Sequence, residues 1–192
     1  MPDAAGLRPL PPGSTIGILG SGQLGRMLAL AAARLGLRTH IYCEESGPAF
    51  DVATATTKAG FEDKAALTAF ANTVDVVTYE FENVPVATAE HLNALLPLHP
   101  PPKALEVAQD RLTEKTFISQ LGVPVAPFAA VGSAAELGAA LARLNAPAIL
   151  KTRRMGYDGK GQIGLKPGDD TAAAWTAIGG HHCVLEQRVP FA

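Results

Sequence analysis

The sequence TIGILGSGQLG, residues 15–25, sets the architecture of the first half of the chain. Its first five residues form a short apolar, β-branched run that leads into glycines, as in a buried parallel strand. The spacing Gly20-x-Gly22-x-x-Gly25 follows, and a helical pattern begins behind it. Because the first N–H groups of a helix lack partners within the helix, this order of strand, glycine turn and helix predicts an α/β domain with an anion-binding turn.

Strands and helices alternate beyond this segment. In the first helix, apolar residues recur at spacings of three and four and so share one face: Leu24, Met27, Leu28, Ala31 and Leu35. The further predicted elements are a strand over 38–43, a weaker strand over 52–57, a helix over 63–71, a strand over 74–78 and a helix over 85–95. This alternation predicts an α/β domain with a parallel sheet over residues 14–100. The four prolines from Pro97 to Pro102 indicate a linker or domain boundary.

The remaining residues, 101–192, follow a different pattern. The predicted elements are a helix over 110–121, an extended segment over 123–127, a capped helix over 133–144, a hairpin of strands 148–151 and 162–166, a helix over 169–178 and a strand over 183–186. Three short strands do not visibly close a sheet. We therefore expect the chain to be a fragment of a longer protein.

The composition excludes several classes of protein. The chain has 192 residues, 47% of them hydrophobic, and a net charge of −2, which argues against disorder and against nucleic-acid binding through bulk charge. Two cysteines do not make a disulfide framework, so a reducing cytoplasm is expected. No apolar run reaches the roughly 18 residues of a membrane span. Residues 1–13 are proline-rich without a signal-peptide core, and we expect a disordered leader.

The residues alone leave two interpretations of the glycine turn open. Glu44 follows the second predicted strand, about 20 residues beyond the turn, where a dinucleotide-binding fold holds a ribose hydroxyl. The literal interpretation is therefore an NAD-binding domain. The alternative is a turn that binds nothing, since glycines also permit tight turns and close helix–strand packing.

Acidic residues follow two of the predicted strands. The segment YEFENVP, residues 79–85, lies where open parallel sheets bind ligands, and alternation lets only one of Glu80 and Glu82 face the crevice. Its alternative is a solvated loop. Glu186 leaves an apolar strand and is suited to accept a hydrogen bond from an adenine amino group, although on its own a structural role is the simpler interpretation.

The basic loop within the hairpin is the strongest functional signal. It has four cations within ten residues: Lys151, Arg153, Arg154 and Lys160. Its glycines are Gly156, Gly159 and Gly161. A flexible cationic loop can close over phosphates, with Lys151 as a fixed point charge at the end of its strand. The alternative is a solvated hairpin tip. Adjacent His181 and His182 have no third ligand nearby, so we predict no metal site in this chain.

Five segments occur in an order that indicates a family: GSGQLGRM (20–27), YEFENVP (79–85), DRLTEK (110–115), LKTRRMGYDGKGQ (150–162) and LEQ (185–187). Over residues 15–192 the chain closely resembles the N5-carboxyaminoimidazole ribonucleotide synthases, which are ATP-grasp ligases of purine biosynthesis. The resemblance implies a Rossmann-like pre-ATP-grasp domain over 14–100 and the small central α+β domain of an ATP-grasp fold over 101–192. The larger C-terminal domain of the family would be missing.

The resemblance also implies a reaction. ATP would phosphorylate bicarbonate, and the carboxyphosphate, or the CO₂ that it releases, would carboxylate the exocyclic amine of 5-aminoimidazole ribonucleotide. The products would be N5-carboxyaminoimidazole ribonucleotide, ADP and phosphate. Mg²⁺ would bridge the nucleotide phosphates through ligands in the missing C-terminal part. The 192-residue chain alone should therefore be inactive.

Residue roles follow from the same resemblance. The nucleotide would be held by Arg111, Lys151, Gly156, Tyr157, Asp158, Gly159, Lys160, Gly161, Gln162, Glu186 and Val189. The ribonucleotide would be held by Gln23, Leu24, Glu80, Tyr157 and Lys160. Lys151 and Lys160 would be the catalytic residues, and Lys160 stands where relatives often have arginine, so a point charge replaces a fork. The glycine turn would then bind the small ribonucleotide instead of NAD, and Glu44 would have no ribose role.

The implied partners are small molecules, namely 5-aminoimidazole ribonucleotide, bicarbonate and ATP, with no nucleic acid or membrane. A cytoplasmic homodimer is implied for the full-length protein. Two other functions stay open at this point. One is a domain of an NAD-dependent oxidoreductase, which leaves the cationic loop unexplained. The other is a non-catalytic nucleotide-binding module that ends here naturally.

Overall fold

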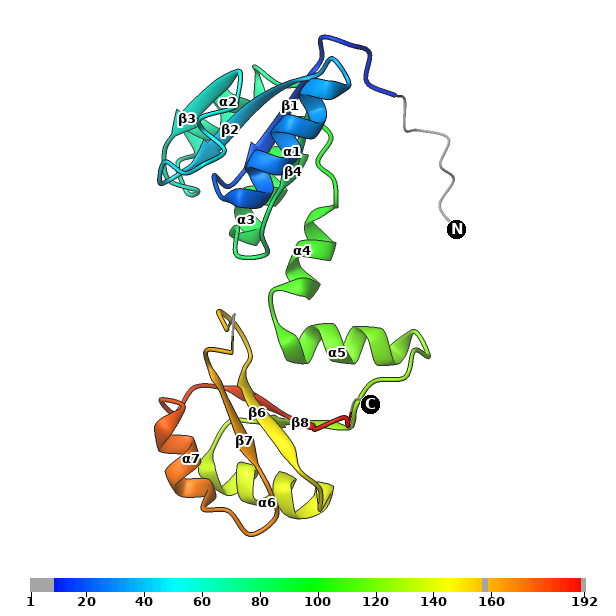
Figure 1. Cartoon of the computed structure of the whole chain (residues 1–192), viewed down its shortest axis with the longest axis vertical. Helices are drawn as coiled ribbons and strands as arrows, with labels where there is room; N and C mark the ends of the chain where they lie inside the picture. The colour runs from blue at the N-terminus through cyan, green and yellow to red at the C-terminus, as the bar shows by residue number, and fades with distance from the viewer. Residues whose placement is uncertain (1–8, 157–158, 191–192) are drawn as a thin grey trace. The chain divides into compact units, whose positions relative to one another are not determined.

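The computed structural model describes residues 9–156 and 159–190 (Figure 1). The chain divides into two compact units, Met1–Glu106 and Val107–Ala192. The first contains a parallel sheet covered by helices and the second an antiparallel sheet with helices, so the predicted fold class is confirmed.

The first unit is built around a parallel sheet in the order β3-β2-β1-β4. Its strands are β1 (Thr15–Leu19), β2 (Arg38–Cys43), β3 (Ala55–Lys58) and β4 (Val76–Tyr79), and its helices include α1 (Gln23–Arg34), α2 (Lys64–Ala71) and α3 (Val86–Asn93). β1 pairs with β2 on one side and with β4 on the other. The chain order therefore reverses between β1 and β4, and their carboxyl ends meet at a topological switch point, where open α/β sheets bind ligands.

Both faces of this sheet are buried. Leu67 and Phe70 of α2 and Leu92 of α3 pack with Leu19 on one face. Ile18, the neighbour of Leu19, points the other way and joins a second cluster, because successive side chains of a strand alternate between faces. In Figure 1, α1 lies in front of the strands and α2 lies behind them. This arrangement fixes the turn between β1 and α1 at the switch point.

Helix α1 buries its small residues and exposes its large ones. Its buried residues are Gly25, Ala29 and Ala32. The residues predicted to share a face do share one, but that face is exposed, with Leu24 at 58% and Leu35 at 71%. A Cβ on Gly25 would lie 3.2 Å from the carbonyl oxygen of Gly20, so the contact between helix and sheet has no room for leucine.

The limits of the first unit differ from the predicted ones. The segment 97–102 belongs to this unit, because Leu98 is buried and forms a parallel bridge with Val77, and Leu105 of α4 (Pro102–Ala108) joins the same core. The division therefore falls after Glu106 and not after residue 100. Residues 1–8 of the predicted leader lie outside the described residues, whereas the amide of Gly13 donates a 2.7 Å hydrogen bond to the Gly36 carbonyl.

Among the described residues, the second unit has a four-stranded antiparallel sheet in the order β5-β8-β6-β7. Its strands are β5 (Phe128–Val131), β6 (Ala148–Thr152), β7 (Gln162–Leu165) and β8 (Cys183–Gln187), and its helices are α5 (Arg111–Gln120), α6 (Ala134–Leu144) and α7 (Thr171–Ala177). Helices α6 and α7 pack together on one face of the sheet (Figure 1). β5 is not predicted from the sequence, because two of its four residues are alanine and only pairing with β8 makes the segment a strand.

Candidate functional site

The glycine turn of the first unit encloses a carboxylate from the neighbouring strand end. Glu80, directly after β4, accepts a 2.5 Å hydrogen bond from the amide of Gly22 through Oε1 and another from the amide of Gly25 through Oε2. A Cβ on Gly20 would lie 2.5 Å from Glu80 Cγ, and the φ of Gly20 is +109°. The glycines are therefore required by the close approach of Glu80, and the carboxylate lies at the positive N-terminus of α1.

Three further residues with predicted roles lie near the glycine turn, namely Glu82, Gln23 and Leu24. Glu82 is exposed, and its side chain accepts a hydrogen bond from Asn83, so Glu80 is the glutamate that faces the turn. Gln23 and Leu24 form the exposed first turn of α1 at the same edge of the sheet. The three residues assigned to the ribonucleotide in this unit thus lie around one turn.

The NAD interpretation of this turn is not supported. The amides of Gly22 and Gly25, which would hold a pyrophosphate, donate to a carboxylate instead. A carboxylate at this position repels a phosphate. Glu44 accepts a 3.0 Å hydrogen bond from the amide of Phe61, so its side chain fastens a neighbouring loop.

The second unit presents a sheet face that points away from α6 and α7. Leu150, Leu165 and Leu185 pack into the core beneath these helices. Because strand side chains alternate, the opposite face carries the residues between them. The pairing register places Glu186 beside Ile149, and Lys151 lies two positions further along β6 on the same face.

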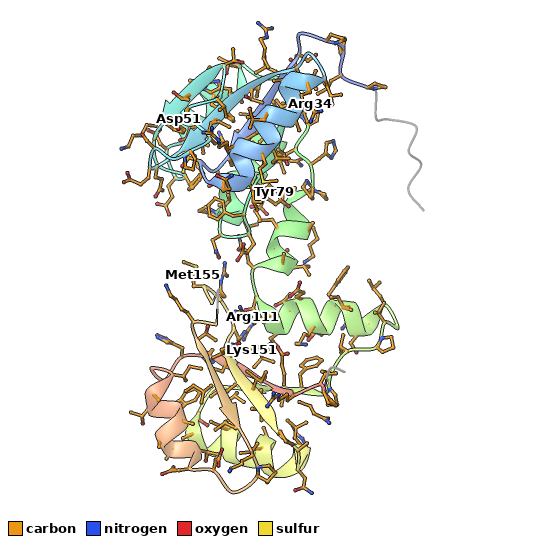
Figure 2. The ribbon with its side chains drawn as sticks, viewed as in Figure 1. Arg34, Asp51, Tyr79, Arg111, Lys151 and Met155 are labelled. Atoms are coloured by element: carbon orange, nitrogen blue, oxygen red, sulfur yellow. The ribbon has the colours of Figure 1, made fainter. Side chains whose placement is uncertain are left out.

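Glu186 lies between two lysines on this face. Its Oε2 atom is 3.1 Å from Nζ of Lys151 and 3.2 Å from Nζ of Lys115. The residue is only 8% exposed. Two cations offset the unfavourable burial of its charge, and the cluster has a net charge of about +1. Figure 2 shows Lys151 and Arg111 at the same end of the unit.

An open cavity of about 850 Å³ adjoins this cluster. Lys151, Glu186 and Val189 are among the residues that line it, which brings together three residues that were assigned to the nucleotide from different parts of the sequence. A second cavity of about 720 Å³ includes Gly159 and Gln162 in its lining. The two cavities share Pro147, Ile149 and Arg188 as lining residues, so they are adjacent on the sheet.

The base of the glycine-rich loop is fastened by an ion pair to the start of α5. Arg153 binds both carboxylate oxygens of Asp110, with nitrogen–oxygen distances between 2.7 and 3.0 Å. Burial alone would raise the pKa of Asp110, but hydrogen bonds from Arg153 and from the amides of Thr113 and Leu112 hold this pKa below its usual value. Asp110 also caps α5, so one carboxylate joins helix and loop.

Two further arginines hold the same loop. The guanidinium group of Arg111 donates to the carbonyl of Thr152 at 2.8 Å and to the carbonyl of Gly156. Arg154 donates a 2.6 Å hydrogen bond to the side chain of Gln109. The spacing of the loop cations predicts one phosphate-binding group, but Arg153 and Arg154 anchor the loop instead.

The tip of the loop is only partly described. Tyr157 and Asp158, both assigned to ligands, lie outside the described residues. At the base, the amide of Thr152 donates a 2.9 Å hydrogen bond to the carbonyl of Gly161. A Cβ on Gly156 would lie 3.1 Å from both Arg111 Nη1 and the carbonyl oxygen of Lys160, so the loop is folded closely on itself here.

Sequence reasoning missed Lys115 as a site residue. The signal was present, because Lys115 lies four residues after Arg111 on α5 and therefore on the same face of the helix. His181 and His182 lie in the loop before β8, as predicted. Within residues 9–156 and 159–190, no group of three or more metal-ligating side chains comes together, and no helix is long and apolar enough to cross a membrane.

Two family models together match most of the chain. The model of the ribonucleotide synthetase pre-ATP-grasp domain matches residues 14–109, and that of the ATP-grasp domain matches residues 116–192. The N5-carboxyaminoimidazole ribonucleotide synthase of Brucella melitensis is 50% identical over 95% of this chain and 51% of its own length.

Two solved structures extend the comparison. The Staphylococcus aureus N5-carboxyaminoimidazole synthetase in complex with ADP is 34% identical, with a TM-score of 0.92 over 99% of this chain and 51% of that one. The Aspergillus clavatus synthase with ADP and 5-aminoimidazole ribonucleotide is 26% identical, with a TM-score of 0.82 over 94% and 48%. The chain spans about half the length of these relatives. Its first half belongs to the ribonucleotide synthetase pre-ATP-grasp family, and the residues that follow belong to an ATP-grasp domain.

Proposed function

We propose that the protein containing this chain is an ATP-dependent ligase. It would carboxylate 5-aminoimidazole ribonucleotide with bicarbonate, through carboxyphosphate, to N5-carboxyaminoimidazole ribonucleotide, ADP and phosphate. The observation that carries the proposal is the cavity at which Lys151, Glu186 and Val189 meet. A point charge for phosphate, a carboxylate acceptor for an amino group and adjacent backbone are the groups that an adenine nucleotide requires.

ATP is assigned to this cavity and the adjacent loop. Glu186 would accept a hydrogen bond from the adenine amino group, with backbone near Val189 beside the ring edge. Lys151 would bind a phosphate, and the loop residues Gly156 and 159–162 would approach the phosphates with their backbone. Mg²⁺ would offset the charge of the phosphates when bound. Arg111 would act from the base of the loop, where it already holds two carbonyls.

The ribonucleotide is assigned to the glycine turn. Glu80 is an acceptor-only group when ionised, so it fits ribose hydroxyls or an amine and repels phosphate. Gln23 and Leu24 would contact the same molecule from the start of α1. This assignment is supported by the position of Glu80 at the switch point of the sheet.

The two lysines proposed as catalytic, Lys151 and Lys160, would act by stabilising negative charge. Attack of the exocyclic amine on the carboxyl carbon forms the carbon–nitrogen bond, phosphate leaves with its bridging oxygen, and the amine loses a proton. Lys151 and Lys160 would stabilise the negative charge that develops on the transferred groups. We further propose that the protein is a homodimer in the cytoplasm. The exposed apolar face of α1 offers a surface for contact between two copies. Light scattering, which measures the molecular mass in solution, tests the dimer.

The test is ADP release by the product of the whole open reading frame that contains these residues. We expect release to require both 5-aminoimidazole ribonucleotide and bicarbonate. Omitting either one in turn supplies the control. Release that depends on neither would contradict the proposed function.

A further inference from the structure

Two lysines share one oxygen of Glu186, but they differ in their surroundings. Of the described residues that line the adjoining cavity, Lys151 is one and Lys115 is not. The ammonium group of Lys115 lies 5.8 Å from the centre of the Phe128 ring, and its side chain is 19% exposed. Phe128 is also the register partner of Glu186 on β5. Lys115 is therefore held by the protein on two sides, whereas Lys151 lies beside the space for a ligand.

This difference predicts what happens when a triphosphate enters. A ligand with several negative charges attracts the lysine that can reach it, so Lys151 would turn from Glu186 to the phosphates. Glu186 would then depend on the remaining cation. A nearly buried carboxylate needs a cation beside it to offset the cost of burying its charge, and that cation also fixes which oxygen faces a ligand.

We propose that Lys115 is a positioning residue for adenine recognition, which holds the carboxylate of Glu186 in place after Lys151 has engaged the phosphates. The proposal rests on the proposed function, because it concerns the same nucleotide site. Both lysines approach Oε2 of Glu186. No hydrogen bond or ion pair within the described residues involves Oε1. Oε1 is thus the atom that accepts from the 6-amino group, and Lys115 holds the opposite oxygen.

The test compares two ligands on one protein. Calorimetry measures the Kd of ATP and of purine riboside 5′-triphosphate, which lacks the 6-amino group, for the product of the whole reading frame. We expect the unmodified protein to prefer ATP by about tenfold, the worth of one hydrogen bond to a charged group. Lys115→Met should weaken ATP about tenfold and change the analogue less than about twofold. Lys115→Arg should retain the preference.

Controls separate this role from a structural one. Lys103→Met removes an exposed lysine that pairs with Glu106, and it should leave both Kd values unchanged. Equal weakening of both ligands by Lys115→Met, or an undiminished preference for ATP, would overturn the proposal. If Lys115→Met does not fold, Lys115→Gln is judged by the same two outcomes. If the unmodified protein binds neither ligand, the proposed function itself fails. This result differs from a change in the ratio of the two Kd values, which tests Lys115 alone.

Discussion

The chain has two glycine-rich segments that follow a strand, and they differ in the charge beside them. In residues 20–25, the carboxylate of Glu80 takes up the amides of Gly22 and Gly25. In residues 152–161, Arg111 and Asp110 anchor the base of the loop, while Lys151 lies next to an open cavity. Glycine content alone indicates close backbone approach in both places. The neighbouring charges differ in sign. The negative charge of Glu80 favours a polar, uncharged group at residues 20–25, and the positive charge of Lys151 favours a phosphate at residues 152–161.

The largest expected effect is at the cationic loop. Lys151→Met removes the point charge beside the cavity, and we expect kcat/KM for ATP to fall by about 10²- to 10³-fold, as for the loss of one charge-stabilising donor. ADP release by the product of the whole reading frame measures this. Lys103→Met is the matched control, because Lys103 forms an exposed ion pair with Glu106. A fall in kcat/KM of less than about threefold would contradict the assignment of the phosphates to the loop of residues 152–161.

The next largest effect is expected at the glycine turn of residues 20–25, where the amides donate to Glu80. Glu80→Ala leaves the amides of Gly22 and Gly25 without their acceptor, and we expect the free energy of unfolding to fall by about 2–3 kcal/mol. Glu82→Ala, at the exposed neighbouring glutamate, should change it by less than about 0.5 kcal/mol. Urea unfolding of both variants gives the comparison. Equal losses would mean that Glu80 does not hold the turn together.

The smallest effect is expected at the ion pair between Asp110 and Arg153, which anchors the loop of residues 152–161. The hydrogen-bonded ion pair with Arg153 keeps the pKa of Asp110 below its usual value despite burial. A carboxylate whose pKa is lower in the folded state stabilises the fold above its unfolded pKa, and this contribution is lost as pH falls through the folded value. Asp110→Asn, which can still cap α5, should therefore cost about 1 kcal/mol at pH 7.

The pH dependence supplies the control for this prediction. The difference in unfolding free energy between the unmodified protein and Asp110→Asn should shrink as the pH falls below about 4, the ordinary pKa of an aspartate in an unfolded chain, and towards the lower pKa of Asp110 in the folded state. Urea unfolding at several pH values from 7 to 3 follows this difference while other carboxylates titrate equally in both proteins. A difference that stays constant or grows with acid would show that Asp110 does not act through its charge.

Much of the fold follows from local spacing. The strand at 15–19, the helix behind Gly20–Gly25 and the hairpin around the basic loop all occur as predicted, because each is signalled by neighbouring residues. β5 was missed, since Phe128–Val131 becomes a strand only through its pairing with β8. The exposed face of α1 was also unforeseen, because an apolar stripe does not show which side of a helix the sheet can approach.

The candidate site divides in the same way. Motif resemblance assigned Lys151 and Glu186 to one ligand, and both line one cavity. Resemblance did not identify Lys115, and composition did not show that Arg153 and Arg154 hold the loop. These roles depend on partners distant in the sequence, such as Asp110 for Arg153 and Gln109 for Arg154.

Local sequence therefore determined the strands, the turns and the types of charge that the two glycine segments carry, because hydrophobic period and glycine spacing act over a few residues. Tertiary structure alone decided which charges meet. Glu80 reaches Gly22 across 58 residues, and Lys151 reaches Glu186 across 35. The physical reason is that an ion pair depends on separation in space, and the order of strands in a sheet sets that separation independently of distance along the chain.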